Sequence, residues 1–97
     1  MDVAEIEERA LAWLLIEIKD LLRELNRAGV SVDAQDEIAT NYLFGLTCRL
    51  DGAEEAGGAA LAFTDGDGDE PDAVHLVRPA VSMHGAVHGT VAELLGR

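Results

Sequence analysis

A small α+β domain with the element order α-α-β-β-α is the fold class that the sequence predicts. Apolar residues recur at helical spacing through the first half of the chain, and two short runs of β type flank an acidic stretch in the second half. A third helical pattern follows them. With 97 residues, the chain is long enough for a single domain with one thin core.

The first predicted element is a long helix over residues 3–28. Asp2 stands where an N-cap is expected, and Gly29 follows where a helix often ends in the left-handed conformation. Acidic residues gather near the start and basic residues near the end, which favours the helix dipole. Its predicted core face consists of Leu11, Leu14, Leu15, Ile18, Leu21, Leu22 and Leu25.

A second helix is expected over residues 33–50, antiparallel to the first. Ser31 or Asp33 can cap its start. Gly45 lies in its interior, where a glycine would permit close packing against the first helix. The predicted core face consists of Ile38, Ala39, Tyr42, Leu43, Leu46 and Leu50.

A β-hairpin is predicted over residues 59–78. Two short apolar runs flank a loop over 65–72, which consists of aspartate, glycine, glutamate and proline. An isolated hairpin is only marginally stable, so we expect it to pack on the helices or on a partner.

The last predicted element is a helix over residues 80–95. Pro79 stands at a position typical of the first residue of a helix. The apolar face expected for this helix consists of Ala80, Met83, His84, Val87, Val91, Leu94 and Leu95.

The charge balance restricts the classes of partner. The chain carries 19 acidic and 7 basic residues, for a net charge of −12. It cannot form the contiguous basic surface that direct binding to nucleic acid or to an anionic membrane requires. A basic protein partner suits this charge, although adaptation to a saline host would also produce it.

The N-terminal residues predict a cytoplasmic protein. The chain starts with an acidic segment, whereas a secretory signal starts with basic residues followed by an apolar run. The longest uninterrupted apolar run, Ala10–Ile16, is too short to cross a membrane. Cys48 is the single cysteine, so an internal disulfide and a cysteine tetrad for zinc are both excluded.

The acidic stretch supports two hypotheses about partners. Asp65, Asp67 and Asp69 alternate as at the start of an EF-hand loop, but positions six and twelve of that motif hold Glu70 and Leu76. We therefore expect a solvated turn, with weak binding of a divalent cation and contact with basic residues of a partner as the alternatives. The acidic partner-binding candidates are Glu54, Glu55, Asp65, Asp67, Asp69, Glu70 and Asp72.

In size and net charge the chain resembles the small acidic phage proteins that inhibit restriction or CRISPR systems. This resemblance implies an alternative function. The protein would mimic nucleic acid and occupy the basic groove of a nuclease or of a guide-RNA complex. Such binding would weaken steeply with added salt.

Three histidines are candidates for a metal site. His84 and His88 are four residues apart, so a helix would place them on one side, and His75 could join them from the hairpin. Histidines on an amphipathic face or at a pH-sensitive contact are the alternatives. We expect no bound metal and no cofactor.

The sequence does not predict an enzyme. It contains no nucleophile elbow and no phosphate-binding glycine loop. Ser82 and His84, two residues apart, would lie on different faces of a helix.

An apolar patch on the first helix predicts a protein-protein interaction module, either an accessory or regulatory subunit or a homo-oligomer. Trp13 and Ile16 lie roughly opposite the predicted core face of that helix. Packing under the hairpin is the alternative for Trp13. The predicted interface residues are Trp13, Ile16, Ile6 and Phe44, and the acids that flank the patch are Glu5, Glu8, Glu17 and Asp20.

Overall fold

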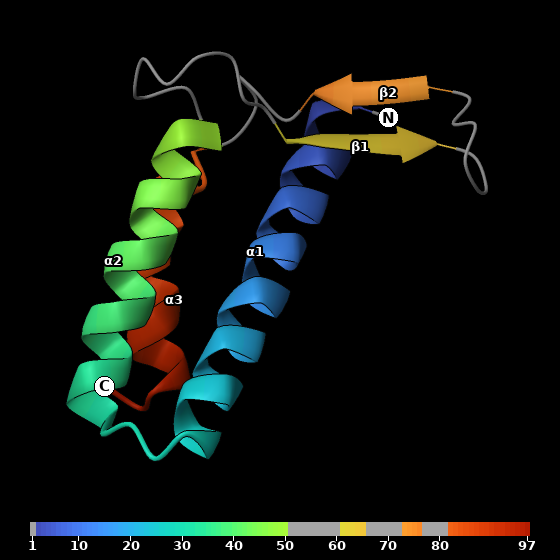
Figure 1. Cartoon of the computed structure of the whole chain (residues 1–97). Coiled ribbons are helices and arrows are strands. Elements are labelled where there is room, and N and C mark those ends of the chain that lie inside the picture. Colours follow the sequence, from blue (N-terminus) through green and yellow to red (C-terminus); the bar gives the residue numbers. More distant parts are fainter. Residues whose placement is uncertain (1, 51–60, 66–72, 77–81) are drawn as a thin grey trace.

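The structure is a computed structural model, and it describes residues 2–50, 61–65, 73–76 and 82–97. Within these residues, three helices pack side by side and two short strands lie beyond one end of them (Figure 1). The elements in chain order are α1 (Val3–Arg27), α2 (Val32–Leu50), β1 (Ala62–Asp65), β2 (Ala73–Leu76) and α3 (His84–Leu94).

The predicted α+β class is wrong, and the fold is a helical bundle. The buried hydrophobic residues of the described chain all belong to the three helices or to Met83, directly before α3. The two strands are four residues long and pair only with each other, antiparallel, with Phe63 opposite His75. A ladder of this size forms no layer of the core. A β-type pattern indicates only a local extended backbone, whereas the fold class depends on which elements cover the core.

Both ends of α1 follow local sequence signals. The side chain of Asp2 accepts a hydrogen bond from the backbone N–H of Glu5, at 2.9 Å. At the other end, Gly29 has a φ of +78°. The backbone N–H groups of Gly29 and Val30 donate to the carbonyls of Asn26 and Leu25, which is the Schellman arrangement. These bonds explain why the observed helix nearly matches the predicted range 3–28.

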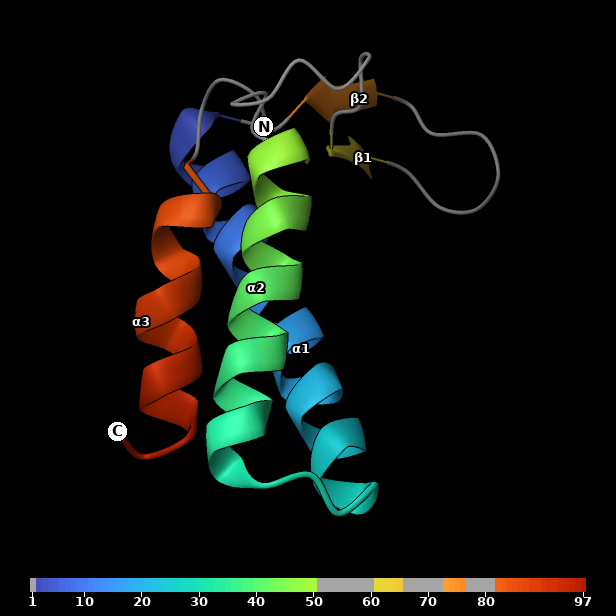
Figure 2. The same cartoon turned by 60° about the vertical axis from the view of Figure 1, so that its left-hand side comes forward.

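The start of α2 is capped by Ser31, one of the two predicted candidates. The Ser31 hydroxyl accepts from the backbone N–H of Ala34, at 3.3 Å. Gln35 is buried, and its side-chain amide donates to the carbonyl of Val30, at 2.8 Å. The short connection between α1 and α2 is therefore held from both sides, and the two helices run antiparallel (Figures 1 and 2).

Helix α3 begins later than predicted. The sequence predicts a start at residue 80, next to Pro79, whereas Ser82 is not helical and α3 starts at His84, with Met83 as its N-cap. Met83 provides no side-chain cap. Its own side chain is completely buried, so core packing rather than capping positions the start of α3. Figure 2 shows α3 beside α2 and running in the opposite direction.

The end of α3 is tied to the start of α2. Gly96 has a φ of +75° and forms a second Schellman turn, in which Arg97 donates its backbone N–H to Ala92. The Arg97 guanidinium then donates to the carboxylates of Asp33 and Asp36. The hydrogen bond to Asp33, together with both negative charges, raises the pKa of Arg97.

The core is a single cluster contributed by the three helices and Met83. On α1 the buried residues are spaced four apart, so they form a narrower face than the predicted stripe, and Leu11 is 38% exposed. The core residues are Ala10, Leu14, Ile18, Leu22, Ala39, Leu43, Met83, Val87 and Val91.

The predicted core face of α2 is partly wrong. Ile38 and Tyr42 are 44% and 64% exposed. The buried face instead includes Thr47, whose hydroxyl donates to the carbonyl of Leu43 at 2.7 Å. That bond satisfies a buried polar group, and it allows threonine to take a core position that an apolarity pattern does not reveal.

Alanine substitutions at two glycines should have opposite effects on stability. Gly29→Ala should lower the free energy of unfolding by about 1–2 kcal/mol, because an L-residue is strained at this φ. Gly45→Ala should raise it by about 1 kcal/mol, because Gly45 is inside a helix and a Cβ there would meet nothing within 4 Å. The prediction that Gly45 allows close packing on α1 is therefore wrong. Urea unfolding monitored by circular dichroism measures both changes. If both substitutions changed the free energy of unfolding in the same direction, the conformations described for the two glycines would be contradicted.

Candidate docking groove between the first two helices

An open groove of about 290 Å³ lies between α1 and α2. Its floor is apolar: Leu43 is buried, and Leu21 and Leu46 are partly buried and pack against the core. Its remaining lining residues are polar or aromatic. They are Glu17, Asp20 and Glu24 from α1 and Tyr42 from α2.

The α1 side of the groove carries three carboxylates, and none of its described lining residues is a lysine or an arginine. Asp20 and Glu24 form exposed ion pairs one turn further along α1, with Arg23 at 3.4 Å and Arg27 at 2.9 Å. Glu17 forms no ion pair with any residue that the structure describes. Exposed pairs of this kind contribute little to stability, so the carboxylates remain available to a stronger cationic partner.

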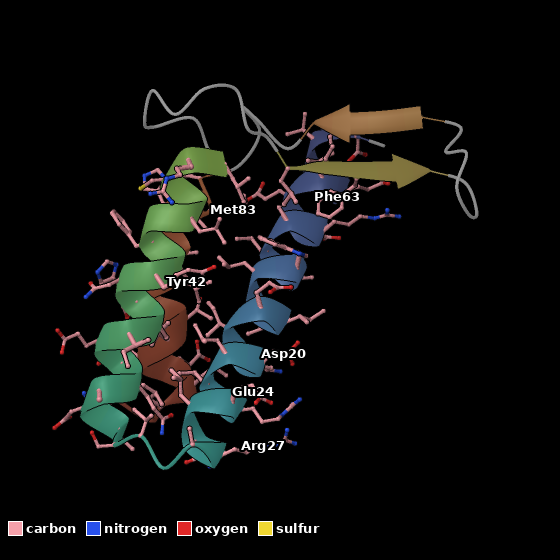
Figure 3. All side chains as sticks on the ribbon, in the orientation of Figure 1. Asp20, Glu24, Arg27, Tyr42, Phe63 and Met83 are labelled. Atoms are coloured by element: carbon pink, nitrogen blue, oxygen red, sulfur yellow. The ribbon has the colours of Figure 1, made fainter. Side chains whose placement is uncertain are left out.

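Tyr42 is the most exposed large apolar side chain of the described residues, at 64%. Figure 3 shows it midway along α2, with Asp20 and Glu24 on the lower half of α1. An aromatic side chain that is left exposed at the edge of an apolar floor is typical of a contact surface.

The other side of α1, toward α3, is hollowed as well. Two open pockets of about 400 and 450 Å³ lie there, and Lys19 and Leu94 line both of them. Arg23 adds a second basic residue at one end and Glu93 an acid at the other. One of these pockets is lined by two bases and the other by one base and one acid, so neither has a row of like charges comparable to the three carboxylates of the α1–α2 groove.

The predicted interface residues on α1 divide between the core and the surface. Trp13 and Ile6 are partly buried and pack against the core, so the prediction that Trp13 points away from it is wrong. Trp13 is three residues beyond the buried Ala10, about 60° around the helix from it, and therefore flanks the narrow core face. Ile16 is 56% exposed, as expected for the outer side of α1.

Phe44 belongs to a different cluster, between α2 and α3. Its ring contacts the rings of His84 and His88 edge to face, with centroid separations of 5.8 and 5.4 Å. Phe44, a predicted interface residue, therefore packs against His84 and His88, two of the candidate metal ligands. Ser82 Oγ lies 3.5 Å from Nδ1 of His84.

Within the described residues, no three histidine, cysteine or carboxylate side chains are arranged to hold a metal ion. The position of the His75 side chain is outside the described part, although the His75 backbone pairs with Phe63. The hypothesis of a three-histidine site stays a prediction.

The acidic partner-binding candidates also stay predictions. Asp65 is the last residue of β1, and its side chain is not described. The other six candidates, Glu54, Glu55, Asp67, Asp69, Glu70 and Asp72, lie outside the described residues. The nucleic-acid-mimic hypothesis depends on these residues, so the described geometry neither supports nor opposes it.

Comparison with protein-family profiles, curated proteins and solved structures finds no match for this chain. None of the described helices combines the length and apolar composition that a bilayer-spanning segment needs.

The sequence predicts only part of the groove. It places Glu17 and Asp20 beside an apolar patch, but its apolar pattern places Tyr42 in the core and gives no role to Glu24. One signal was present in the sequence. Positions 17, 20 and 24 are spaced by three and four residues, which places all three acids on one side of a helix.

Proposed function

We propose that this protein is an interaction module, with no catalytic activity of its own, that binds a protein partner in the α1–α2 groove. The observation that supports this is the lining of the groove: an apolar floor, an exposed tyrosine and three carboxylates, with no base among the described lining residues. Protein interfaces combine a desolvated apolar centre with a polar rim, and this groove has both parts.

The overall charge favours such a module kinetically. At a net charge of −12, the protein attracts a basic partner over a distance of about one Debye length before contact. The apolar floor and Tyr42 then contribute short-range burial, which determines how slowly the complex dissociates. The proposed docking surface is the α1–α2 groove and not the predicted patch around Trp13, because Trp13 packs on the core of its own chain.

Site-specific photocrosslinking in the cells that produce the protein tests this function. A benzophenone amino acid replaces Tyr42 in one variant and Phe44 in a second. The two positions are matched, since both are exposed aromatic residues of the same helix, but only Tyr42 lines the groove. We expect position 42 to crosslink one defined protein and position 44 to crosslink it weakly or not at all.

The crosslinked protein is then purified and mixed with the unmodified chain. Sedimentation velocity should show a complex of fixed stoichiometry. The proposal is overturned if neither position crosslinks a protein, or if the protein captured from position 42 does not bind when both components are pure. Crosslinking from position 44 alone would place the interface at the cluster of Phe44, His84 and His88 instead.

A further inference from the structure

We infer that the occupant of the α1–α2 groove is a basic amphipathic helix of the partner, lying along α1 and α2 as an additional helix of the bundle. This inference rests on the proposed function and names the chemistry of its partner. It is carried by the spacing of the groove carboxylates, by the shape of the floor and by the exposure of Tyr42.

The three groove carboxylates are complementary to a row of positive charges on the partner. Glu17 and Glu24 are seven residues apart, so they are separated by about 10 Å, or two turns, along the α1 axis, with Asp20 between them. A partner helix that lies alongside α1 can present arginine or lysine at the same intervals, one near each carboxylate. A basic helix in this register therefore places one cation near each of the three carboxylates.

The apolar floor of the groove is complementary to a stripe of apolar residues on the partner, next to its positive charges. Leu21 of α1 and Leu43 and Leu46 of α2 line the groove between two antiparallel helices. A third helix packs into such a groove through residues spaced three and four apart. A β-strand would instead leave one row of backbone hydrogen-bonding groups unpaired, because a helical wall offers them no partners.

Tyr42 favours arginine over lysine on the α2 side of the partner. Tyr42 is 64% exposed and lines the α2 side of the groove, whereas the three carboxylates line the α1 side. A guanidinium can stack on an aromatic face and also form paired hydrogen bonds with a carboxylate, which an ammonium group cannot do. The occupant is thus an arginine-containing helix with apolar residues along one side.

A synthetic basic amphipathic peptide should bind the α1–α2 groove. The probe is a fluorescent 18-residue peptide of leucine, arginine and glutamine, with leucines at helical spacing and arginines beside them. A scrambled peptide of the same composition is its control. Fluorescence anisotropy should show the amphipathic peptide binding about tenfold more tightly than the scrambled one, since only the first presents both stripes together.

Two matched charge variants locate the binding site. The groove variant combines Glu17→Gln, Asp20→Asn and Glu24→Gln, and the control variant combines Glu8→Gln, Glu37→Gln and Glu93→Gln. Each changes three exposed acids to neutral residues, so the net charge changes equally. The groove variant should raise Kd about tenfold and the control about twofold or less, because contact pairs weaken more than distant charges do. Tyr42→Ala should raise Kd several-fold with no change in charge.

Equal effects of the two triple variants, or equal binding of the scrambled peptide, would overturn the inference. So would concentration-dependent self-association of the protein that the groove variant abolishes, because the occupant would then be a second copy. The partner segment crosslinked from position 42 provides an independent check, because its sequence should be basic with apolar residues three and four apart. A defined partner with an acidic or extended segment would refute this inference and leave the proposed function standing.

Discussion

Ile18→Ala should lower the free energy of unfolding by about 3 kcal/mol, because truncating a buried isoleucine removes apolar contacts and leaves a cavity. Ile18 is fully buried at the centre of the α1 face and is part of the single core cluster. A domain of this size has a total stability of about 5–15 kcal/mol, so the loss is a large fraction of it. Urea unfolding monitored by the helical circular dichroism signal measures the change.

Ile16→Ala is the matched control for this substitution. Ile16 is the same residue type on the same helix, but it is 56% exposed and lies about 200° around the helix from Ile18. Its truncation should change stability by less than about 0.5 kcal/mol. If Ile18→Ala prevents folding, Ile18→Val should still fold and cost about 1 kcal/mol. Comparable losses at positions 16 and 18 would show that the faces of α1 are wrongly assigned.

Trp13→Ala should destabilise the isolated chain by about 2 kcal/mol, a value reduced from that of a fully buried tryptophan because the residue is only partly buried. Trp13 packs against the core cluster, as do the partly buried Ile6, Leu61 and Phe63. Figure 3 shows Phe63 of β1 near the upper half of α1. Trp13→Phe should restore part of the lost stability, since it retains an aromatic ring.

Trp13 is the only tryptophan of the chain, so its fluorescence reports directly on its surroundings. In the isolated protein its emission should be blue-shifted relative to the unfolded chain. An emission maximum unchanged by denaturant, or a stability unchanged by Trp13→Ala, would show that Trp13 is not packed in its own chain. The residue would then be available for docking, as the sequence predicts. The two measurements therefore separate packing within the chain from the predicted interface.

The groove differs from the originally predicted patch in the kind of evidence that defines it. The prediction for Trp13 depends on a general rule, that a large aromatic side chain on the second face of a helix needs a contact. In the structure, that contact is supplied by the chain itself. Tyr42 has no such cover among the described residues, and it lines the same groove as three carboxylates of α1. The tertiary structure therefore favours Tyr42 as the docking side chain, although the apolar pattern of α2 predicts a core position for it.

The sequence alone determined the features that depend on a few neighbouring residues. The cap at Asp2, the cap at Ser31 and the left-handed turn at Gly29 occur where they were expected. Each is a hydrogen bond or a backbone preference within one turn of helix, so its energy is already present in the local sequence. The helical nature of all three long apolar-periodic segments is similarly local.

Only the tertiary structure decided which side of each helix is buried and how much the strands contribute. Trp13 flanks the core, Tyr42 is exposed, and Arg97 reaches Asp33 and Asp36 across more than sixty residues of sequence. Apolar residues cover more than one side of these helices, so periodicity leaves several faces compatible with burial. The choice among them depends on the helices that pack against each face, and hence on contacts between residues that are distant in the chain.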